Sequence, residues 1–342
     1  MEKQKLIFIT PKIDESHDDL AFASLWAQGF IDAGFDVQVI CTSIGPHSLS
    51  VPVHSLGGEK GAKRWMQVLR FWKLLWTIPH DRAYVHMTPR WLFMGCWIWW
   101  LRRIPCYLWF THYTNTISLK IGSRFAKRMF AATKECLPQY EGSPKKVVTG
   151  HGIDTRFWNV PLLSESEKES PKHLLAVHRI SRSKRLEIVI RALALLPEEY
   201  TLTHYGRPQD PRFDGDYKGE IESLIKELGL EKRVRLMGSI PMKDLRSIYP
   251  KYQTFINMVP STIDKSTLEA MYCGGLTPVM SKGPAENIGY PEFVPEDTPE
   301  ATAEFIRNMR IWKPEDLKQI IEERHSLHRL IEKMSVYIRP GN

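Results

Sequence analysis

The sequence predicts an α/β protein with two domains, each built around a doubly wound parallel sheet. The chain has 342 residues, and at roughly 100 to 200 residues per domain this length corresponds to two domains. Short apolar runs alternate with amphipathic helical patterns in both halves, as in parallel sheets that are covered by helices. A polar stretch rich in Ser, Glu and Lys, residues 161–172, separates the halves and is expected to be a linker.

The first half opens with a β-α-β pattern. Residues 5–10 (KLIFIT) predict a buried strand, residues 18–33 a helix that stops at Gly34, and residues 37–41 a second strand. Further apolar runs predict strands at residues 83–87, 107–110 and 146–148.

The same alternation restarts after the linker. Its apolar runs predict strands at residues 174–177, 201–205, 234–237, 254–258 and 277–280, and its amphipathic segments predict helices at residues 185–196, 218–228 and 242–249. We therefore expect two Rossmann-like domains, at residues 1–160 and 173–318. A final helix from about residue 315 to 337, largely within the C-terminal part 319–342, is long enough to cross back to the first domain. Ligands of such sheets bind beyond the carboxyl ends of the strands, so a cleft between the domains is expected.

Composition and motif content exclude several classes of protein. Hydrophobic residues make up 43% and charged residues 25% of the chain, so it is neither disordered nor collagenous. The five cysteines contain no C-x-x-C pair, which argues against a disulfide scaffold and favours a reducing, cytosolic compartment. Histidines and acids show no metal-ligand spacing, so no metal is expected. The glycine-rich motifs of dinucleotide and P-loop sites are also absent.

Basic residues and tryptophans are concentrated between residues 60 and 134. This range holds 14 Lys and Arg against one acid, Asp81, and eight of the eleven tryptophans. A basic amphipathic helix is predicted here by the helical spacing of Trp65, Val68, Leu69, Trp72, Leu75 and Trp76. Either this helix packs its apolar stripe on the first sheet, or residues 60–103 dock on an anionic membrane surface.

No apolar run in the sequence is long enough to span a membrane. The longest uncharged stretch of this region, residues 91–101, stops at Arg102 and Arg103. The apolar run near the start is shorter than a signal-peptide core, so no export signal is expected.

An ordered set of motifs in the second half is the most specific feature of the sequence. It comprises TGHGID at 149–154, AVHRISRSKRLEIVIRAL at 176–193, LTHYGRP at 202–208, VRLMGSIP at 234–241 and PSTIDKSTLEAMYCGGLTPVMS at 260–281. In this order the motifs resemble those of the retaining GT-B glycosyltransferases of family 4. The resemblance covers residues 145–340 well and the first half more loosely, and it implies the GT-B fold.

The resemblance implies that Arg179 and Lys184 bind the diphosphate of a nucleotide-sugar donor. These two cations lie five residues apart, across a turn between a strand end and a helix start. Both can therefore converge on one pyrophosphate and stabilise the charge that develops as it leaves, which makes a divalent metal unnecessary. Gly206 and Arg207, which follow the next strand, are assigned to the same donor site.

The segment 260–281 is expected to hold the donor's phosphate and ribose. Backbone N–H groups in the first turn of a helix bind anions, and here that turn is formed by Lys265, Ser266, Thr267 and Leu268. Glu269 matches the second acid of the family's E-x7-E motif, which implies contact with the ribose hydroxyls. The first acid, which in the family contacts the donor hexose, is replaced by Ser261. In the variant motif D-K-x-x-L-E-A-M the nearest carboxylate, Asp264, is expected to substitute for it as a catalytic residue.

Two histidines are also assigned by the resemblance. His112, in LWFTHYT after a strand of the first half, is implied to contact the donor hexose. His178 stands where the family usually has Gly, and it either lines the donor site or packs within its strand.

These features predict a cytosolic, retaining, metal-independent glycosyltransferase. It is expected to move a hexose from a nucleotide-diphosphate sugar on the second domain to a glycan or lipid-linked acceptor on the first, with GDP-mannose slightly favoured over a UDP-sugar. No cofactor besides the donor substrate and no nucleic-acid partner are expected. The expected location is cytoplasmic, including a peripheral position on the inner face of the cytoplasmic membrane. The alternatives are a sugar-nucleotide epimerase or phosphorylase of the same fold and, less favoured, a basic nucleic-acid-binding protein.

Overall fold

The computed structural model describes residues 3–17 and 20–339, which divide into two compact units. Unit 1 comprises Met1–His151 and Leu327–Asn342, and unit 2 comprises Gly152–Ser326. The expected linker, residues 161–172, is part of unit 2, where the Glu169 amide donates to the Lys251 carbonyl over 2.6 Å. Asp18, the expected start of the first helix, lies outside the described residues.

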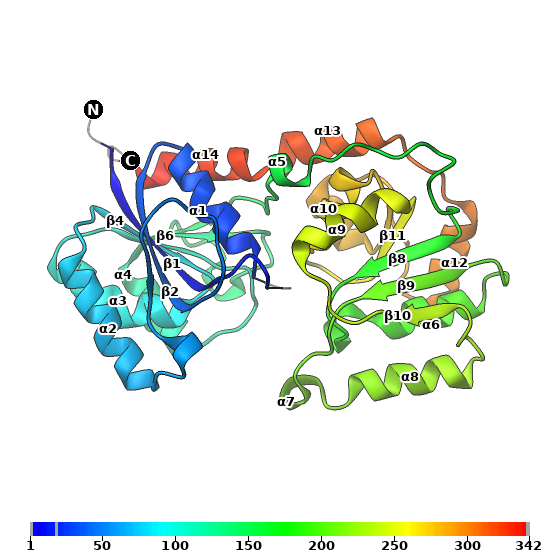
Figure 1. Ribbon diagram of the computed structural model, residues 1–342, viewed down its shortest axis with the longest axis horizontal. Helices are drawn as coiled ribbons and strands as arrows, with labels where there is room; N and C mark the ends of the chain where they lie inside the picture. The colour runs from blue at the N-terminus through cyan, green and yellow to red at the C-terminus, as the bar shows by residue number, and fades with distance from the viewer. Residues whose placement is uncertain (1–2, 18–19, 340–342) are drawn as a thin grey trace. The chain divides into compact units, whose positions relative to one another are not determined.

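Unit 1 is built on a seven-stranded parallel sheet with the strand order β3-β2-β1-β4-β5-β6-β7 (Figure 1). Its strands are β1 (Lys5–Ile13), β2 (Asp36–Ile44), β3 (Val53–Ser55), β4 (Arg82–His86), β5 (Cys106–Trp109), β6 (Ala126–Ala131) and β7 (Lys146–Val148). The strands β3 and β6 were not expected from the sequence pattern, whereas β7 has the expected bounds.

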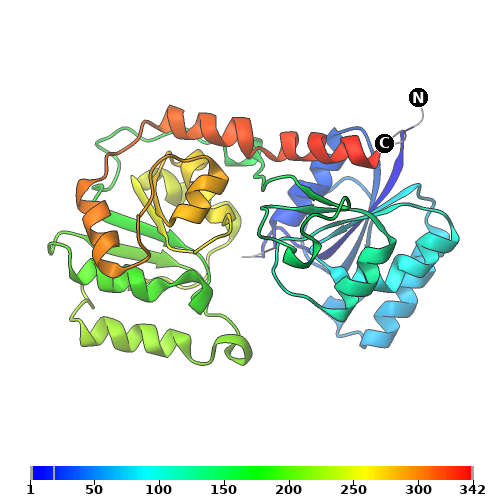
Figure 2. The ribbon, with the colours of Figure 1, turned by 180° about the vertical axis from the view of Figure 1, so that it is seen from behind.

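Helices cover both faces of this sheet (Figures 1 and 2). They are α1 (Phe22–Asp32), α2 (Arg64–Thr77), α3 (Pro89–Leu101), α4 (Ile117–Phe125) and α14 (Leu327–Ile338), with short 3-10 turns η1 (Gly58–Lys60) and η2 (Pro138–Tyr140). Helices α1 and α14 lie on one face, and α2, α3 and α4 lie on the other (Figure 1). No helix of the described residues is long and apolar enough to cross a membrane.

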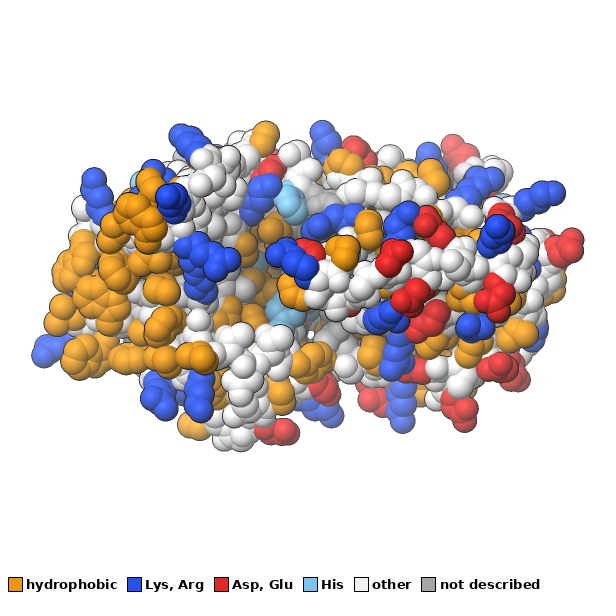
Figure 3. Space-filling model, turned by 90° about the horizontal axis from the view of Figure 1, so that it is seen from below, with side chains coloured by type: hydrophobic (Ala, Val, Ile, Leu, Met, Phe, Trp, Pro, Cys, Tyr) orange, Lys and Arg blue, Asp and Glu red, His pale blue; other side chains and the backbone are white. Residues whose placement is uncertain are grey.

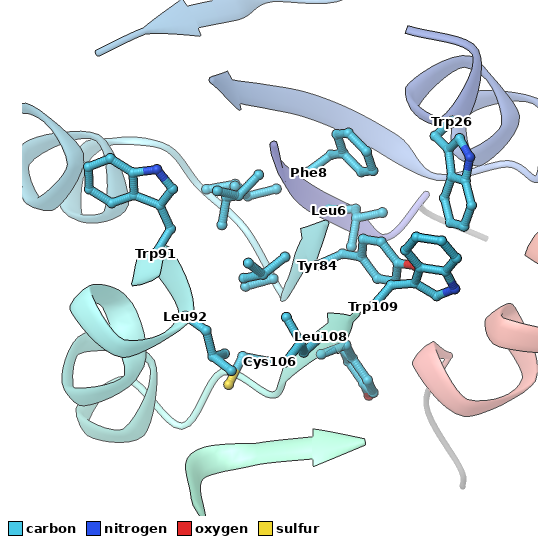
Figure 4. Close-up of a cluster of buried hydrophobic side chains, with 14 of the residues drawn as sticks. Leu6, Phe8, Trp26, Tyr84, Trp91, Leu92, Cys106, Leu108 and Trp109 are labelled. Carbon is cyan, nitrogen blue, oxygen red and sulfur yellow. The ribbon is translucent and has the colours of Figure 1, made fainter. Parts of the chain in front are cut away.

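Aromatic side chains fill the core of unit 1 between the sheet and its helices (Figure 4). Phe8 of β1 stacks on Tyr84 of β4 with ring centroids 5.8 Å apart, and Trp26 of α1 lies 4.6 Å from Trp109 of β5. Burial of such large rings fixes the central strands, and with them the loops at their carboxyl ends.

The last described helix, α14, completes unit 1. Gly29 of α1 has no side chain where Ile331 of α14 packs, and a Cβ there would lie 2.3 Å from the Ile331 side chain. The Tyr107 hydroxyl donates to the Tyr337 carbonyl over 3.0 Å, and the Arg82 guanidinium donates to the Ile338 carbonyl over 2.8 Å.

The single helix expected from about residue 315 to 337 is wrong, because the segment forms two helices. Helix α13 (Pro314–Arg324) ends just before His325, and α14 starts at Leu327. The His325 carbonyl accepts a hydrogen bond from the Ile153 amide (2.9 Å), and the His325 ring lies 2.9 Å from the Ile288 carbonyl. These tertiary bonds replace the helical ones, so the break is set by contacts that local periodicity does not contain.

Unit 2 is built on a five-stranded parallel sheet with the order β10-β9-β8-β11-β12. Its strands are β8 (His173–Val177), β9 (Thr201–Tyr205), β10 (Val234–Leu236), β11 (Thr254–Asn257) and β12 (Thr277–Met280). Its helices and turns are α5 (Thr155–Trp158), η3 (Arg182–Lys184), α6 (Leu186–Ala194), α7 (Pro211–Asp214), α8 (Tyr217–Glu227), α9 (Met242–Ile248), η4 (Tyr249–Lys251), α10 (Lys265–Cys273), α11 (Lys282–Ile288), α12 (Pro299–Asn308) and α13. The sheet order places β8 and β11 side by side, so the loops that follow these two strands share one edge.

Candidate functional site

The loop after β8 carries the two predicted cations of unit 2. Arg179 follows the apolar strand, and its Nη1 donates to Oε1 of Gln209 over 2.7 Å. Lys184 ends the turn η3, and the next residue, Arg185, has a φ of 52°, in the left-handed region. This backbone reversal lets α6 start at Leu186, directly after the polar loop.

Gly206 allows the loops after β8 and β9 to approach closely. Its φ is 150°, and a Cβ at this position would lie 1.8 Å from the carbonyl oxygen of His178. The Gly206 amide donates to the Gly238 carbonyl over 2.7 Å, and the Ile180 amide donates to the Arg207 carbonyl over 2.9 Å. The glycine is thus required by packing in this loop pair, and Arg207 lies exposed beside it.

Lys184 forms an ion pair with Asp264, the residue that precedes α10. The amide nitrogen Nδ2 of Asn257, at the end of β11, donates to the same Asp264 oxygen over 3.0 Å. Burial alone would raise the pKa of the Asp264 carboxyl, but the Lys184 ammonium and the Asn257 amide outweigh it and hold this pKa well below its usual range. The carboxylate is therefore ionised and fixed toward Lys184.

His178 is a buried, neutral histidine beside this ion pair. Burial and the Lys184 charge lower the pKa of His178 to about 4. Its Nδ1 lies 3.0 Å from the Arg179 carbonyl and 3.3 Å from Nε2 of the buried His204. The structure thus shows that His178 packs against His204 of strand β9. Its Nε2 atom is buried without a hydrogen-bond partner among the described residues.

Helix α10 presents its first turn at the same edge of the sheet. The side chain of Asp264 makes no capping hydrogen bond to this turn, since it is held by Lys184 and Asn257. The hydroxyl of Ser266 is buried and has no partner among the described residues. The Thr267 amide donates to the Asp264 carbonyl over 3.1 Å. Helix-start amides that lack a side-chain cap, with the helix dipole behind them, attract an anion.

Glu269 lies inside α10 and is 6% exposed. Burial raises the pKa of its carboxyl to about 7, with nearby Lys265 opposing and Asp264 adding to the rise. The hydroxyl of the buried Tyr249 lies next to this carboxyl. A carboxyl of this kind is able to accept hydrogen bonds from ligand hydroxyls at neutral pH.

His112 belongs to unit 1. It follows β5, is exposed, and its ring lies 5.2 Å from that of Phe110. Its carbonyl accepts a hydrogen bond of 3.4 Å from the Leu137 amide.

Most of the predicted residues of the second half come together at one edge of the unit 2 sheet. Lys184 and Asp264 are in direct contact, and Lys265, Ser266, Thr267, Leu268 and Glu269 all lie in α10. Sequence reasoning missed two polar groups, Gln209, which binds Arg179, and Asn257, which binds Asp264. Asn257 could have been predicted as a site residue from the sequence, because it is a polar residue at the end of an apolar strand.

Metal-ligating side chains are not grouped in the part of the chain that the structure describes. No set of three or more His, Cys, Asp or Glu residues there is arranged to hold a metal ion. The five cysteines are buried and unbridged.

Solved structures of low sequence identity share the architecture over nearly the whole chain. Anabaena Alr3699/HepE in complex with UDP and glucose is 18% identical, with a TM-score of 0.74, over 98% of this chain and 99% of that chain. Sucrose-phosphate synthase from Thermosynechococcus elongatus is 16% identical, with a TM-score of 0.74, over 98% of each chain. An α-glucosyltransferase in complex with UDP-glucose and DNA containing an abasic site is 12% identical, with a TM-score of 0.70, over 98% and 99%. The predicted α/β fold is thereby confirmed, and it is the GT-B fold.

A family model matches a part of unit 2. Residues 164–288 match the family described as Glycosyl transferases group 1. This segment contains Arg179, Lys184, Asp264 and Glu269. No curated protein matches the chain by sequence.

Proposed function

We propose that the protein is a glycosyltransferase that moves a hexose from a nucleotide-diphosphate sugar to a glycan or lipid-linked acceptor. One observation carries the proposal: Arg179, Lys184 and the uncapped first turn of α10 occupy one sheet edge inside the segment that matches the Glycosyl transferases group 1 model. Two cations and a helix start together suit a diphosphate. The donor binds unit 2, and the acceptor binds unit 1.

The chain's own residues stabilise the leaving diphosphate in this proposal. Arg179 supplies a planar fork and Lys184 a compact charge where negative charge develops as the sugar bond breaks. Glu269 accepts hydrogen bonds from the ribose hydroxyls. With the charge met by side chains, transfer proceeds without a divalent metal. The acceptor attacks on the same face as the departing diphosphate, which takes the acceptor's proton, so the anomeric configuration is retained.

The donor and the compartment are also proposals. The sequence favours GDP-mannose slightly, and the Anabaena HepE structures contain UDP and UDP-glucose, so GDP-mannose and UDP-glucose are the first two donors to test. A reducing cytoplasm suits the five unbridged cysteines.

The test is donor turnover by the full chain against a panel of nucleotide sugars, with and without EDTA. We expect release of GDP or UDP from one donor, unchanged by EDTA, and a thermal shift with the matching nucleoside diphosphate. Absence of both the release and the shift across the panel would overturn the glycosyltransferase proposal. Release that EDTA abolishes would overturn only the metal-independent mechanism.

A further inference from the structure

The outer surface of α2, α3 and α4 in unit 1 carries a group of exposed large apolar side chains. We call this group the apolar patch, and it consists of Trp65, Leu69, Trp76, Trp97, Trp100, Leu101, Ile117 and Phe125. Trp65 is 61% exposed, Trp100 70% and Ile117 77%. Every tryptophan that is exposed in the described part of the chain belongs to this patch. Figure 3 shows hydrophobic side chains gathered on its left side, with Lys and Arg side chains between and around them.

The apolar patch is not needed for the core of unit 1. Helix α2 buries a different stripe, Gln67, Phe71 and Leu75, and α3 buries Trp91, Leu92 and Trp99 among others. The apolar stripe expected on α2 therefore splits, because Leu75 is buried while Trp65, Leu69 and Trp76 face outward. Tryptophans that face outward lower the solubility of a protein, and an interaction with another surface would explain why they are present.

Contacts between the helices join the elements that carry the patch. The Trp72 and Trp97 rings lie 5.6 Å apart, and Trp72 Nε1 donates to the Met94 carbonyl over 2.8 Å, which joins α2 to α3. The Arg102 guanidinium of α3's end lies 5.7 Å from the Trp76 ring. Helix α4 packs along α3, and it carries the exposed Ile117 and Phe125.

The patch is surrounded by positive charge. Exposed basic side chains on the same helices and their ends are Lys63, Arg64, Lys73, Arg103, Lys120 and Arg124. From residue 60 to 134 the sequence has one acid, Asp81. The surface thus combines indole rings with an excess of Lys and Arg.

We propose that this surface docks on an anionic lipid bilayer. Indole rings favour the depth of lipid headgroups, where an apolar body and a polar N–H are both accommodated, and Lys and Arg are attracted to anionic headgroups. A second copy of this chain placed symmetrically on the patch would set like charges against each other. A nucleic acid would match the basic residues but would leave Leu69, Leu101 and Ile117 exposed.

Vesicle co-sedimentation of the full chain tests the proposal. We expect binding to vesicles of phosphatidylcholine with phosphatidylglycerol, little binding to phosphatidylcholine alone, and release as salt rises. Two triple variants, Trp65→Ser/Trp76→Ser/Trp100→Ser and Lys63→Glu/Arg64→Glu/Lys73→Glu, should each lower vesicle affinity by about tenfold or more. Since all six side chains are exposed, the melting temperature should change little.

Matched variants on unit 2 provide the controls. Phe213→Ser removes an exposed apolar side chain, and Lys226→Glu/Lys232→Glu/Lys243→Glu reverses three exposed charges, so both should bind vesicles like the original chain. Equal recovery in the supernatant with both vesicle types at low salt would overturn the proposal. A dimer in sedimentation velocity that the tryptophan variant dissociates would also overturn it. Binding of duplex DNA in preference to vesicles would overturn it as well. Donor turnover, measured on the same variants, should persist, which keeps this test separate from that of the proposed function.

Discussion

Lys184 and Asp264 form an ion pair that joins the loop after β8 to the start of α10. These residues are 80 positions apart in the chain. The pair places a cation beside the first turn of α10 and draws the Asp264 carboxylate away from the amides that it would otherwise cap.

Removing either predicted cation should slow sugar transfer strongly. Arg179→Ala and Lys184→Ala should each lower kcat/KM by about two to four orders of magnitude, since each removes charge stabilisation worth roughly 3 to 5 kcal/mol in the transition state. Steady-state kinetics with the donor identified by the panel provide the measurement. Arg191→Ala and Lys226→Ala, which alter exposed cations of unit 2, are the matched controls. Near-original turnover by Arg179→Ala or Lys184→Ala at saturating donor would show that the residue is not part of the site.

Asp264→Asn should destabilise the protein, and the loss in free energy of unfolding should be larger at neutral pH than in acid. The folded-state pKa of Asp264 is lowered, so its contribution is complete above the unfolded pKa of about 3.9 and is lost as pH falls from there through the folded-state pKa. We expect a loss of about 1 to 3 kcal/mol in the free energy of unfolding at pH 7, because Lys184 keeps a largely buried charge without its partner. Urea denaturation at pH 7 and at pH 3 measures this. An equal difference at both pH values would contradict the ion pair's role.

Glu269→Gln should stabilise the protein at pH 8 and weaken donor binding. The folded-state pKa of Glu269 is raised to about 7, so the original chain loses stability as pH rises from the unfolded value near 4.3 through 7. The variant avoids this loss and should gain about 1 to 3 kcal/mol at pH 8 and little at pH 5. Urea denaturation at both pH values, with the exposed Glu227→Gln as control, checks the prediction. A gain that is the same at pH 5 and pH 8 would argue against a raised pKa.

Gly206→Ala should destabilise unit 2 and displace the Arg179 loop. The new Cβ would lie 1.8 Å from the His178 carbonyl oxygen, so the backbone must move, at a cost of about 2 to 4 kcal/mol. Gly229→Ala is the matched control, since its φ is +66° and nothing lies within 4 Å of the added Cβ. The control should lose only about 1 kcal/mol. Comparable losses for the two variants would mean that the close approach at Gly206 does not matter.

The strands that local sequence predicted well are those with short apolar runs between polar turns. For β9 (Thr201–Tyr205) and β12 (Thr277–Met280) the expected and observed bounds agree. Strand β6 was missed because it follows α4 without a Gly or Pro, and because Lys127 and Arg128, its second and third residues, interrupt the apolar run. The break after α13 was missed because hydrogen bonds to Ile153 and Ile288, far away in the chain, create it.

For the candidate site, the sequence predicted the positions of residues better than their partners. The first turn of α10 lies where the motif placed it, starting at Lys265. The pairing of Lys184 with Asp264 and of Arg179 with Gln209 depends on which strands are neighbours in the sheet, and residue spacing does not contain that order. The same reason explains why His178 is seen packed on His204 only in the structure.

The docking of α14 on unit 1 has a consequence for how the protein is made. Tyr84 and Met334, which touch in the folded unit through a 3.1 Å contact between hydroxyl and sulfur, are 250 residues apart in the chain. A ribosome therefore releases the sheet of unit 1 long before the helix that covers part of it, and unit 2 emerges in between with all of its strands contiguous. The half of the protein that is synthesised first is completed last, and until α14 is made the apolar face that it covers is open to contact with other chains.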